Sequence, residues 1–311
     1  MPTPPELTAA ASPSPLRRWG GLAAGLVVFA FLGLALVDGW SAVSEYDWEL
    51  DPLQLGLGCL VLAVFYVFSG RGYTAIQDRL HQPGPPERVT MAIWAKSLLG
   101  RYVPGNVLMV LGRVVLAYER GVPRRVTLAA TVYEQVLTVG VAAAGAVGFV
   151  AFYAGDDRDA RLWLLALVPL GLLALHPRIF GPLTTWVLRK AGREPLPRLI
   201  ATPWLLALFA WYVIVAVVLG VGMWLVIHSA TGGDAGGPGF IGLAFLLSFA
   251  VSMVAFIFPS GLGVREGAFA IALAQNLPTG VAVALSVGAR LVLTVVELVV
   301  IAVLVWAGRD R

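Results

Sequence analysis

FIFPSGLGVRE, residues 256–266, interrupts an apolar run with Pro259, two glycines and the adjacent charges Arg265 and Glu266. Proline and glycine weaken or break helices, and a charge without a partner is costly in hydrocarbon. Irregular backbone survives at membrane depth only where it is buried in protein or lines a wet cavity. We therefore expect this stretch to form part of a working site.

The composition of the rest of the chain is typical of a membrane protein. Of its 311 residues, 59% are hydrophobic and 13% are charged, and the mean hydropathy is +0.83. Residues 1–16, rich in proline, are expected to form a disordered cytoplasmic tail before one membrane domain, 17–311. The sequence leaves open whether 162–188 is one kinked helix or two. Apolar helices long enough for a bilayer are expected at about 19–37, 53–73, 126–153, 162–176, 204–227 and 279–306.

Two further apolar regions, 91–118 and 240–276, are broken by proline and glycine and match each other at a fixed offset. Pro259 follows Pro104 by 155 residues, and the same offset superimposes the long apolar stretches that come next. Such self-similarity is the sequence trace of many transporter folds. We predict an internal duplication with repeats of about 17–155 and 160–311.

Loop charges predict how the two repeats are oriented. The loops at 38–52 and 228–239 lack Lys and Arg, whereas the loop at 74–90 and the tail at 309–311 carry arginines. Loops rich in Lys and Arg face the cytoplasm. Both termini of this chain face the cytoplasm only if each broken region enters the membrane and leaves it on the same side. The prediction is an all-α polytopic protein of the inner membrane, with six spanning helices and two re-entrant helical hairpins in an inverted-topology repeat.

This geometry predicts an anion site where the two hairpin tips meet. The returning half-helices begin after the two prolines, and the positive ends of their dipoles point toward the bilayer centre. Arginine adds paired, charge-assisted contacts to phosphate oxygens. The alternative left open is that the arginines reach the interface or pair with Glu119 and Glu266. The expected substrate-binding residues are Arg101, Pro104, Gly105, Asn106, Arg113, Pro259, Ser260, Gly261, Gly263, Arg265 and Glu266.

Three more charges, Glu134, Arg290 and Glu297, lie inside predicted spans. An unpaired charge at the bilayer centre costs about 2.5–3.5 kcal/mol, so we expect these side chains to pair. In one pairing Glu134 meets Arg290, because the two occupy neighbouring positions in the two repeats. In the other, Arg290 meets Glu297 on the same helix face. The sequence leaves both pairings open, and with them a structural or a gating role.

These motifs carry a resemblance. The segment 259–266, with Gly100-Arg101-Tyr102-Val103-Pro104-Gly105 and Gly112-Arg113, is similar to the lysylphosphatidylglycerol synthase transmembrane-region family, which includes the lipid-flipping half of the multiple peptide resistance factor. The resemblance covers about 19–306. It implies that Pro259, Gly261, Gly263 and Glu266 form a re-entrant motif and that the substrate is an anionic or polyprenyl-linked lipid. Ser260 stands where glycine is expected, and without the family's soluble aminoacyl-transferase half we expect no lysyl-lipid synthesis.

The sequence lacks the motifs that are typical of several other classes of function. The sequence has no Gly-x-x-x-x-Gly-Lys-Ser/Thr loop, and one cysteine with three scattered histidines does not make a metal site. We expect no enzyme activity, no metal or other cofactor and no nucleic-acid partner. The favoured function is a flippase that moves an anionic phospholipid or a polyprenyl-phosphate-linked glycolipid between leaflets. The alternatives are a non-transporting accessory subunit, partnered with a glycosyltransferase or lipid synthase, and an ion-coupled carrier of a small soluble anion.

Overall fold

The computed structural model describes residues 33–34, 37, 39–102, 107–155, 166, 200–254 and 263–309. Within these ranges the regular elements are helices. The spans expected at 19–37 and 162–176 lie almost wholly outside them, whereas the other four expected spans are confirmed. The helices long and apolar enough to cross a membrane are α3 (Pro52–Leu80), α6 (Arg124–Tyr153), α9 (Thr202–Thr231) and α12 (Thr279–Ala307).

Local sequence signals set the ends of α3 and α9. The Asp51 carboxylate accepts hydrogen bonds from the backbone N–H groups of Leu53 (2.9 Å) and Gln54 (3.1 Å), and Pro52 occupies the first helical position. At the far end of α9, Gly232 takes a left-handed conformation with φ of 58° and closes the helix. Capping of this kind satisfies backbone groups that the helix itself leaves free.

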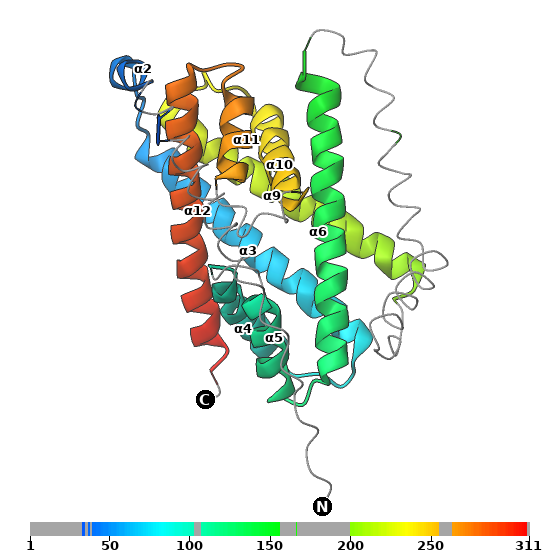
Figure 1. The fold of residues 1–311 in the computed structure, drawn as a ribbon. Coiled ribbons are helices and arrows are strands. Elements are labelled where there is room, and N and C mark those ends of the chain that lie inside the picture. The colour runs from blue at the N-terminus through cyan, green and yellow to red at the C-terminus, as the bar shows by residue number, and fades with distance from the viewer. Residues whose placement is uncertain are drawn as a thin grey trace, which may run out of the picture.

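The helices α3 and α9 pack along each other and cross obliquely behind the upright α6 and α12 in the view of Figure 1. Small residues allow this approach: Gly58 lies against Val226, and Gly222 lies against Leu62. Side chains as small as glycine are favoured at helix contacts in membranes, where close packing replaces the hydrophobic effect as the source of association. The two long helices therefore form a tight central pair.

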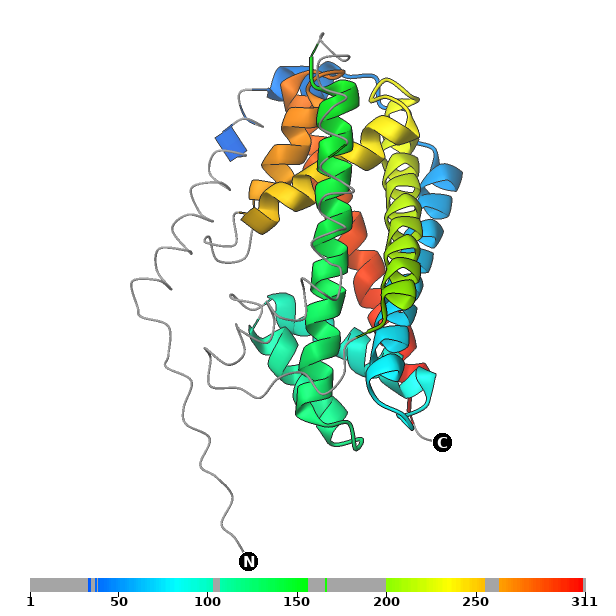
Figure 2. The same ribbon diagram turned by 90° about the vertical axis from the view of Figure 1, so that its right-hand side faces the viewer.

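Apart from the six-residue α2 (Trp40–Glu45), the shorter helices form two hairpins at opposite ends of the bundle, as both views show (Figures 1 and 2). The first hairpin consists of α4 (Glu87–Leu98), η1 (Leu99–Tyr102) and α5 (Val107–Tyr118); the second consists of α10 (Pro238–Val254) and α11 (Val264–Leu273). The longest of these helices, α10, has 17 residues and so measures about 25 Å, short of the roughly 30 Å hydrocarbon core. The connecting segments 103–106 and 255–262 lie outside the described residues.

Each hairpin packs against long helices from both halves of the chain. In the first hairpin, α4 contacts α12 and α5 contacts α6; in the second, α10 contacts α6 and α11 contacts α12. The halves are thus interlocked, and residues far apart in sequence come together between the hairpins.

The two ends of the bundle differ in the charge of their side chains. At the end where the second hairpin begins, the described loops and helix termini carry Glu45, Asp47, Glu49, Asp51 and Asp234 and no Lys or Arg. Arginines stand in the loops and helix termini of the opposite end, beside the first hairpin: Arg79, Arg88, Arg120, Arg124, Arg125 and Arg309.

Candidate functional site

Two groups of charged side chains lie inside the helical bundle, one for each hairpin. We call the first the α5 cluster and the second the central cluster. The α5 cluster consists of Tyr73, Trp94, Ser97, Arg113 and Glu134. The central cluster consists of Tyr66, Arg101, Arg265, Glu266, Arg290 and Glu297.

In the α5 cluster both charged side chains are fully engaged by ion-pair, hydrogen-bond and ring contacts. Arg113, whose side chain is 1% exposed, forms an ion pair with Glu134, donates from Nε to Ser97 Oγ (2.9 Å) and lies 4.5 Å over the ring of Tyr73. The Trp94 indole N–H donates to the other Glu134 oxygen (2.6 Å). A buried ion pair needs such additional hydrogen bonds to offset its desolvation. Arg113 therefore has no free surface for a ligand, and we remove it from the proposed binding residues.

Arg101 and Glu297 form one side of the central cluster. Arg101 lies at the end of η1 and Glu297 on α12, with Nη2 and Oε1 separated by 2.9 Å. The second carboxylate oxygen of Glu297 accepts a hydrogen bond from the Tyr66 hydroxyl on α3 (3.0 Å). The Glu297 side chain is 4% exposed and that of Arg101 31%. This contact joins the first hairpin to the last helix of the chain.

Glu266 anchors the other side of the central cluster. Its Oε1 lies 3.4 Å from Arg290 Nε on α12, and its Oε2 accepts a hydrogen bond from the Gly263 N–H (2.8 Å). Ser286 Oγ also donates to the Glu266 carbonyl oxygen (2.7 Å). Gly263 has φ of +87°, a conformation that glycine adopts at little cost and that lets the chain turn into α11. Glu266 thus caps α11 and ties it to α12.

Arg265 has a different environment. Its guanidinium carbon lies 4.3 Å from the ring centre of Phe245 and 5.2 Å from that of Phe249, both on α10. Its Nε is buried without a hydrogen-bond partner, and the structure gives Arg265 no ion pair with any described carboxylate. The charges of Arg290, Glu266 and Arg101 are close enough to act on it. Arg265 is therefore a cation held by aromatic rings among ion pairs.

The structure corrects both expected pairings of the membrane-embedded charges. Glu134 does not pair with Arg290, and Arg290 does not pair with Glu297. The hairpins are the physical reason, because α5, η1 and α11 bring nearer partners to the long helices. Two positions seven apart on one helix are separated by about 10 Å along its axis. All three expected residues form ion pairs, but with other partners.

The predicted binding residues divide into three groups. Arg101, Arg265 and Glu266 meet in the central cluster, which Gly263 adjoins as the start of α11. Arg113 lies in the α5 cluster. The remaining six lie outside the described residues: Pro104, Gly105, Asn106, Pro259, Ser260 and Gly261.

Sequence reasoning missed the uncharged polar members of both clusters. Tyr66 and Tyr73 lie on one buried stripe of α3 that continues through Gln77, with a spacing of seven and then four residues. Polar side chains repeated at helical spacing along an otherwise apolar span are a readable signal for an inward-facing surface. Trp94, Ser97 and Ser286 are isolated in sequence and give no such signal.

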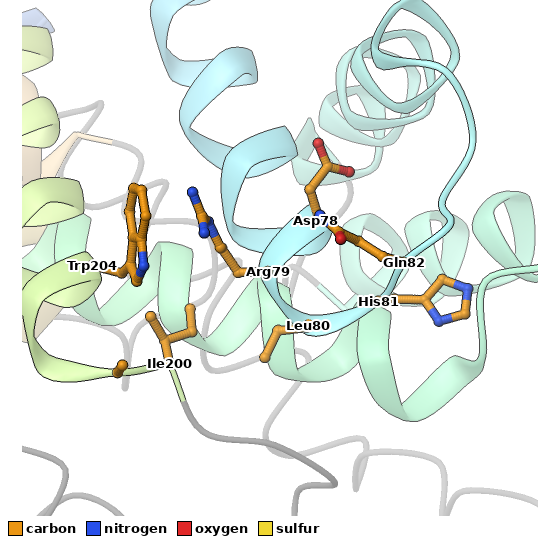
Figure 3. A pocket seen from close by; sticks show the side chains of 8 residues that line it. Asp78, Arg79, Leu80, His81, Gln82, Ile200 and Trp204 are labelled. Atoms are coloured by element: carbon orange, nitrogen blue, oxygen red, sulfur yellow. The ribbon is translucent and has the colours of Figure 1, made fainter.

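One cavity lies apart from the charge clusters, at the end of α3 and the start of α9. It has a volume of about 500 Å³, and the Arg79 guanidinium stacks 3.2 Å over the Trp204 ring at its wall (Figure 3). Tyr66 of the central cluster is about 20 Å away along α3, so the cavity does not contain that cluster. The lining residues are Asp78, Arg79, Leu80, His81, Gln82, Ile200, Ala201 and Trp204.

Comparison with known proteins identifies the family. Residues 19–301 match the family described as lysylphosphatidylglycerol synthase TM region. The chain belongs to this family. The match covers both hairpins, α3, α6, α9 and α12 as far as residue 301, and it confirms the resemblance carried by the motifs at 100–105 and 259–266. No curated protein matches this member of the lysylphosphatidylglycerol synthase TM family, and no solved structure does.

The acidic, histidine and cysteine side chains of the described residues are dispersed. Among residues 39–102, 107–155, 200–254 and 263–309, no three His, Cys, Asp or Glu side chains gather closely enough to hold an ion. The two carboxylates of the central cluster are each engaged by an arginine instead. The chemistry available in the cluster is therefore hydrogen bonding and charge pairing by guanidinium groups.

Proposed function

We propose that this chain moves an anionic lipid between the leaflets of an inner membrane, with the headgroup passing through the central cluster. The observation that carries the proposal is Arg265, a cation at the start of α11 that lies near Arg101 of η1 and has no carboxylate partner among the described residues. An isolated charge at that depth is costly unless something binds it. Membership of the lysylphosphatidylglycerol synthase TM family and the apolar helices support a lipid-related role.

The proposal includes two re-entrant hairpins related by an inverted repeat. Three features support this: both hairpins are too short to span, they occupy opposite ends of the bundle (Figure 1), and their helices pack reciprocally on α6 and α12. With two further spans at about 19–37 and 162–176, six helices cross the membrane and both termini face the cytoplasm. The arginine-rich end of the bundle would then be cytoplasmic and the acidic end external.

In the proposed mechanism the headgroup exchanges contacts within the central cluster while its tails stay in lipid. Arg265 binds a phosphate oxygen through its unpartnered Nε, and the partly exposed Arg101 and Arg290 approach from either side. The Arg101–Glu297 contact links the first hairpin to α12, so its making and breaking accompanies rocking of one half against the other. The saturated α5 cluster keeps the first hairpin fixed to α6 throughout. The mechanism asks for no covalent chemistry and no cofactor.

A leaflet-exchange assay tests the proposal. The full chain is reconstituted in liposomes that contain fluorescent anionic phospholipids or polyprenyl-phosphate sugars in both leaflets, and a membrane-impermeant quencher reports the exposed fraction. Exchange is expected with the parent chain and is expected to fall by about tenfold or more in Arg265→Ala, since a charged hydrogen bond is worth about 1.5–3 kcal/mol. Arg71→Ala is the matched control, because the Arg71–Glu87 pair is more than half exposed.

The outcomes separate the competing functions. Accumulation of a soluble anion, coupled to proton or sodium flux and without lipid exchange, would establish the ion-coupled carrier. Absence of any transport, together with stimulation of an added glycosyltransferase or lipid synthase, would establish the accessory subunit. Lipid exchange that is equal in the parent, Arg265→Ala and Arg71→Ala would keep the function and remove the central cluster from it.

A further inference from the structure

The charges of the central cluster do not cancel. Arg101 pairs with Glu297, and Arg290 pairs with Glu266, which leaves the positive charge of Arg265. Three guanidinium groups and two carboxylates give the described cluster a net charge of +1. The adjoining segments 103–106 and 255–262 contain no Asp or Glu in the sequence, so they bring no compensating carboxylate.

The surroundings of Arg265 define how a ligand meets it. Phe245 and Phe249 lie at cation–π distance from the guanidinium, so its planar faces are directed toward rings. Donors of a guanidinium lie in its plane, and the buried Nε has no partner. An acceptor oxygen is therefore missing at Nε, and a phosphate group can supply that oxygen together with a second one for the neighbouring Nη, as in a bidentate arginine–phosphate contact.

From this balance we infer that the headgroup recognised by the central cluster carries a single negative charge, as a lipid phosphodiester bound by Arg265. The inference rests on the proposed function and narrows its substrate class. One phosphodiester charge neutralises the cluster. A phosphomonoester carries close to two charges at neutral pH and a diphosphate carries more, so either would leave negative charge uncompensated in a poorly solvated site. Phosphatidylglycerol-type lipids and polyprenyl-phosphate sugars both present a phosphodiester, whereas phosphatidic acid and polyprenyl-diphosphate sugars do not.

The first experiment compares lipids that differ in headgroup charge. Exchange by the reconstituted full chain is measured for phosphatidylglycerol, a polyprenyl-phosphate hexose, phosphatidic acid, a polyprenyl-diphosphate hexose and phosphatidylcholine. At least one of the two phosphodiester lipids of net charge −1 is expected to exchange fastest, and the comparison between those two identifies the lipid class. Fastest exchange of phosphatidic acid, the diphosphate lipid or zwitterionic phosphatidylcholine would overturn the inference.

The second experiment changes the charge of the site. Arg265→Gln lowers the net charge to zero and is expected to reduce phosphodiester binding by about ten- to a hundredfold, while Arg265→Lys keeps the preference for one charge with weaker binding. Glu297→Gln raises the net charge to +2 and is expected to shift the preference toward phosphatidic acid. An unchanged preference in all folded variants would contradict the inference. Where Glu297→Gln fails to fold, the two Arg265 variants decide.

Binding in detergent separates this inference from the proposed function. Affinity of the solubilised full chain for the same lipids is measured by quenching of intrinsic fluorescence. Selective binding of phosphodiester lipids without leaflet exchange would sustain the inference and reject the flippase. Leaflet exchange with equal affinity for lipids of charge −1 and −2 would sustain the flippase and reject the inference.

Discussion

Each hairpin is joined to the long helix that follows it by an ion pair, and the charges are reversed between the two pairs. In the first, the arginine is on the returning helix, Arg113 on α5, and the glutamate follows on α6; in the second, Glu266 is on the returning helix α11 and Arg290 follows on α12. The first pair is buried and held by Ser97, Tyr73 and Trp94, whereas Arg290 is 28% exposed and lies near Arg265, which has no carboxylate partner in the part of the chain that the structure describes. The contrast teaches that charge alone does not reveal the role of a buried arginine. What distinguishes a structural arginine from one that can bind a ligand is whether its N–H donors already have partners.

Removing one partner of the dry pair is the strongest test of this contrast. Glu134→Leu leaves Arg113 charged and buried, and should cost about 3–5 kcal/mol in the free energy of unfolding. Thermal unfolding in detergent and the yield of monodisperse protein measure the loss. The double variant Arg113→Met/Glu134→Leu removes both charges and should recover most of the stability. Equal stability of the parent and the single variant would show that water reaches Arg113 in the α5 cluster.

The backbone contact inside the first hairpin gives the next largest effect. A Cβ added at Gly100 would lie 2.5 Å from the backbone nitrogen of Met109, so Gly100→Ala must push η1 away from α5. We expect a loss of about 1–3 kcal/mol, typical of overpacking. Gly112→Ala in the same hairpin is the control, since it meets nothing within 4 Å and should change stability by less than about 1 kcal/mol. Matching thermal shifts for the two variants would argue against the close contact.

Two serines sharpen the comparison between the hairpins. Ser97 Oγ accepts a hydrogen bond from charged Arg113, whereas Ser286 Oγ donates to a neutral carbonyl of Glu266. Ser97→Ala should cost about 1.5–3 kcal/mol and Ser286→Ala about 1 kcal/mol, because hydrogen bonds to charged groups are stronger. Chemical or thermal unfolding of the two variants side by side measures the difference. The reverse order would mean that the second hairpin depends more on its polar contacts than the first.

The smallest effect concerns the acidic end of the bundle. Burial, the hydrogen bond to Asp234 (3.1 Å) and nearby carboxylates raise the pKa of Tyr46 to about 12 from 10.0. The folded state therefore holds the hydroxyl proton more tightly than the unfolded chain. Its stabilising contribution is intact below about pH 10 and is lost as the pH rises toward 12. Tyr46→Phe should flatten this decline in melting temperature, and an unchanged decline would remove Tyr46 from its cause.

The sequence was sufficient for the long helices and for the location of the breaks. Apolar runs predict α3, α6, α9 and α12, and the expected broken regions 91–118 and 240–276 enclose most of the two hairpins. These features depend on local sequence, through hydropathy and the helix-breaking effect of proline and glycine. The expected spans at 19–37 and 162–176 and the two hairpin tips stay predictions.

The partners in the ion pairs could not be predicted from the sequence, because they depend on distances between helices. The offset of 155 residues places Glu134 next to the position of Arg290, which suggested that the two attract each other. In the structure each is paired with the hairpin that precedes it in the chain, Glu134 with Arg113 and Arg290 with Glu266. The two pairs carry their charges in opposite order, so the matching of single residues at a fixed offset gives no sign of them. The dryness of Arg113 likewise follows from Trp94 and Tyr73, which arrive from other helices.

The placement of these pairs bears on how the protein is made. Arg113 and Glu134 are 21 residues apart, and Glu266 and Arg290 are separated by a similar stretch, so acid and base leave the ribosome in quick succession. Each hairpin and the helix after it carry their own counter-ion into the bilayer, before synthesis of the other half is needed. The Arg101–Glu297 contact spans both halves and forms only when the last helix has been inserted. Biogenesis would then proceed through two units, each with one internal ion pair, that the Arg101–Glu297 contact joins at the end.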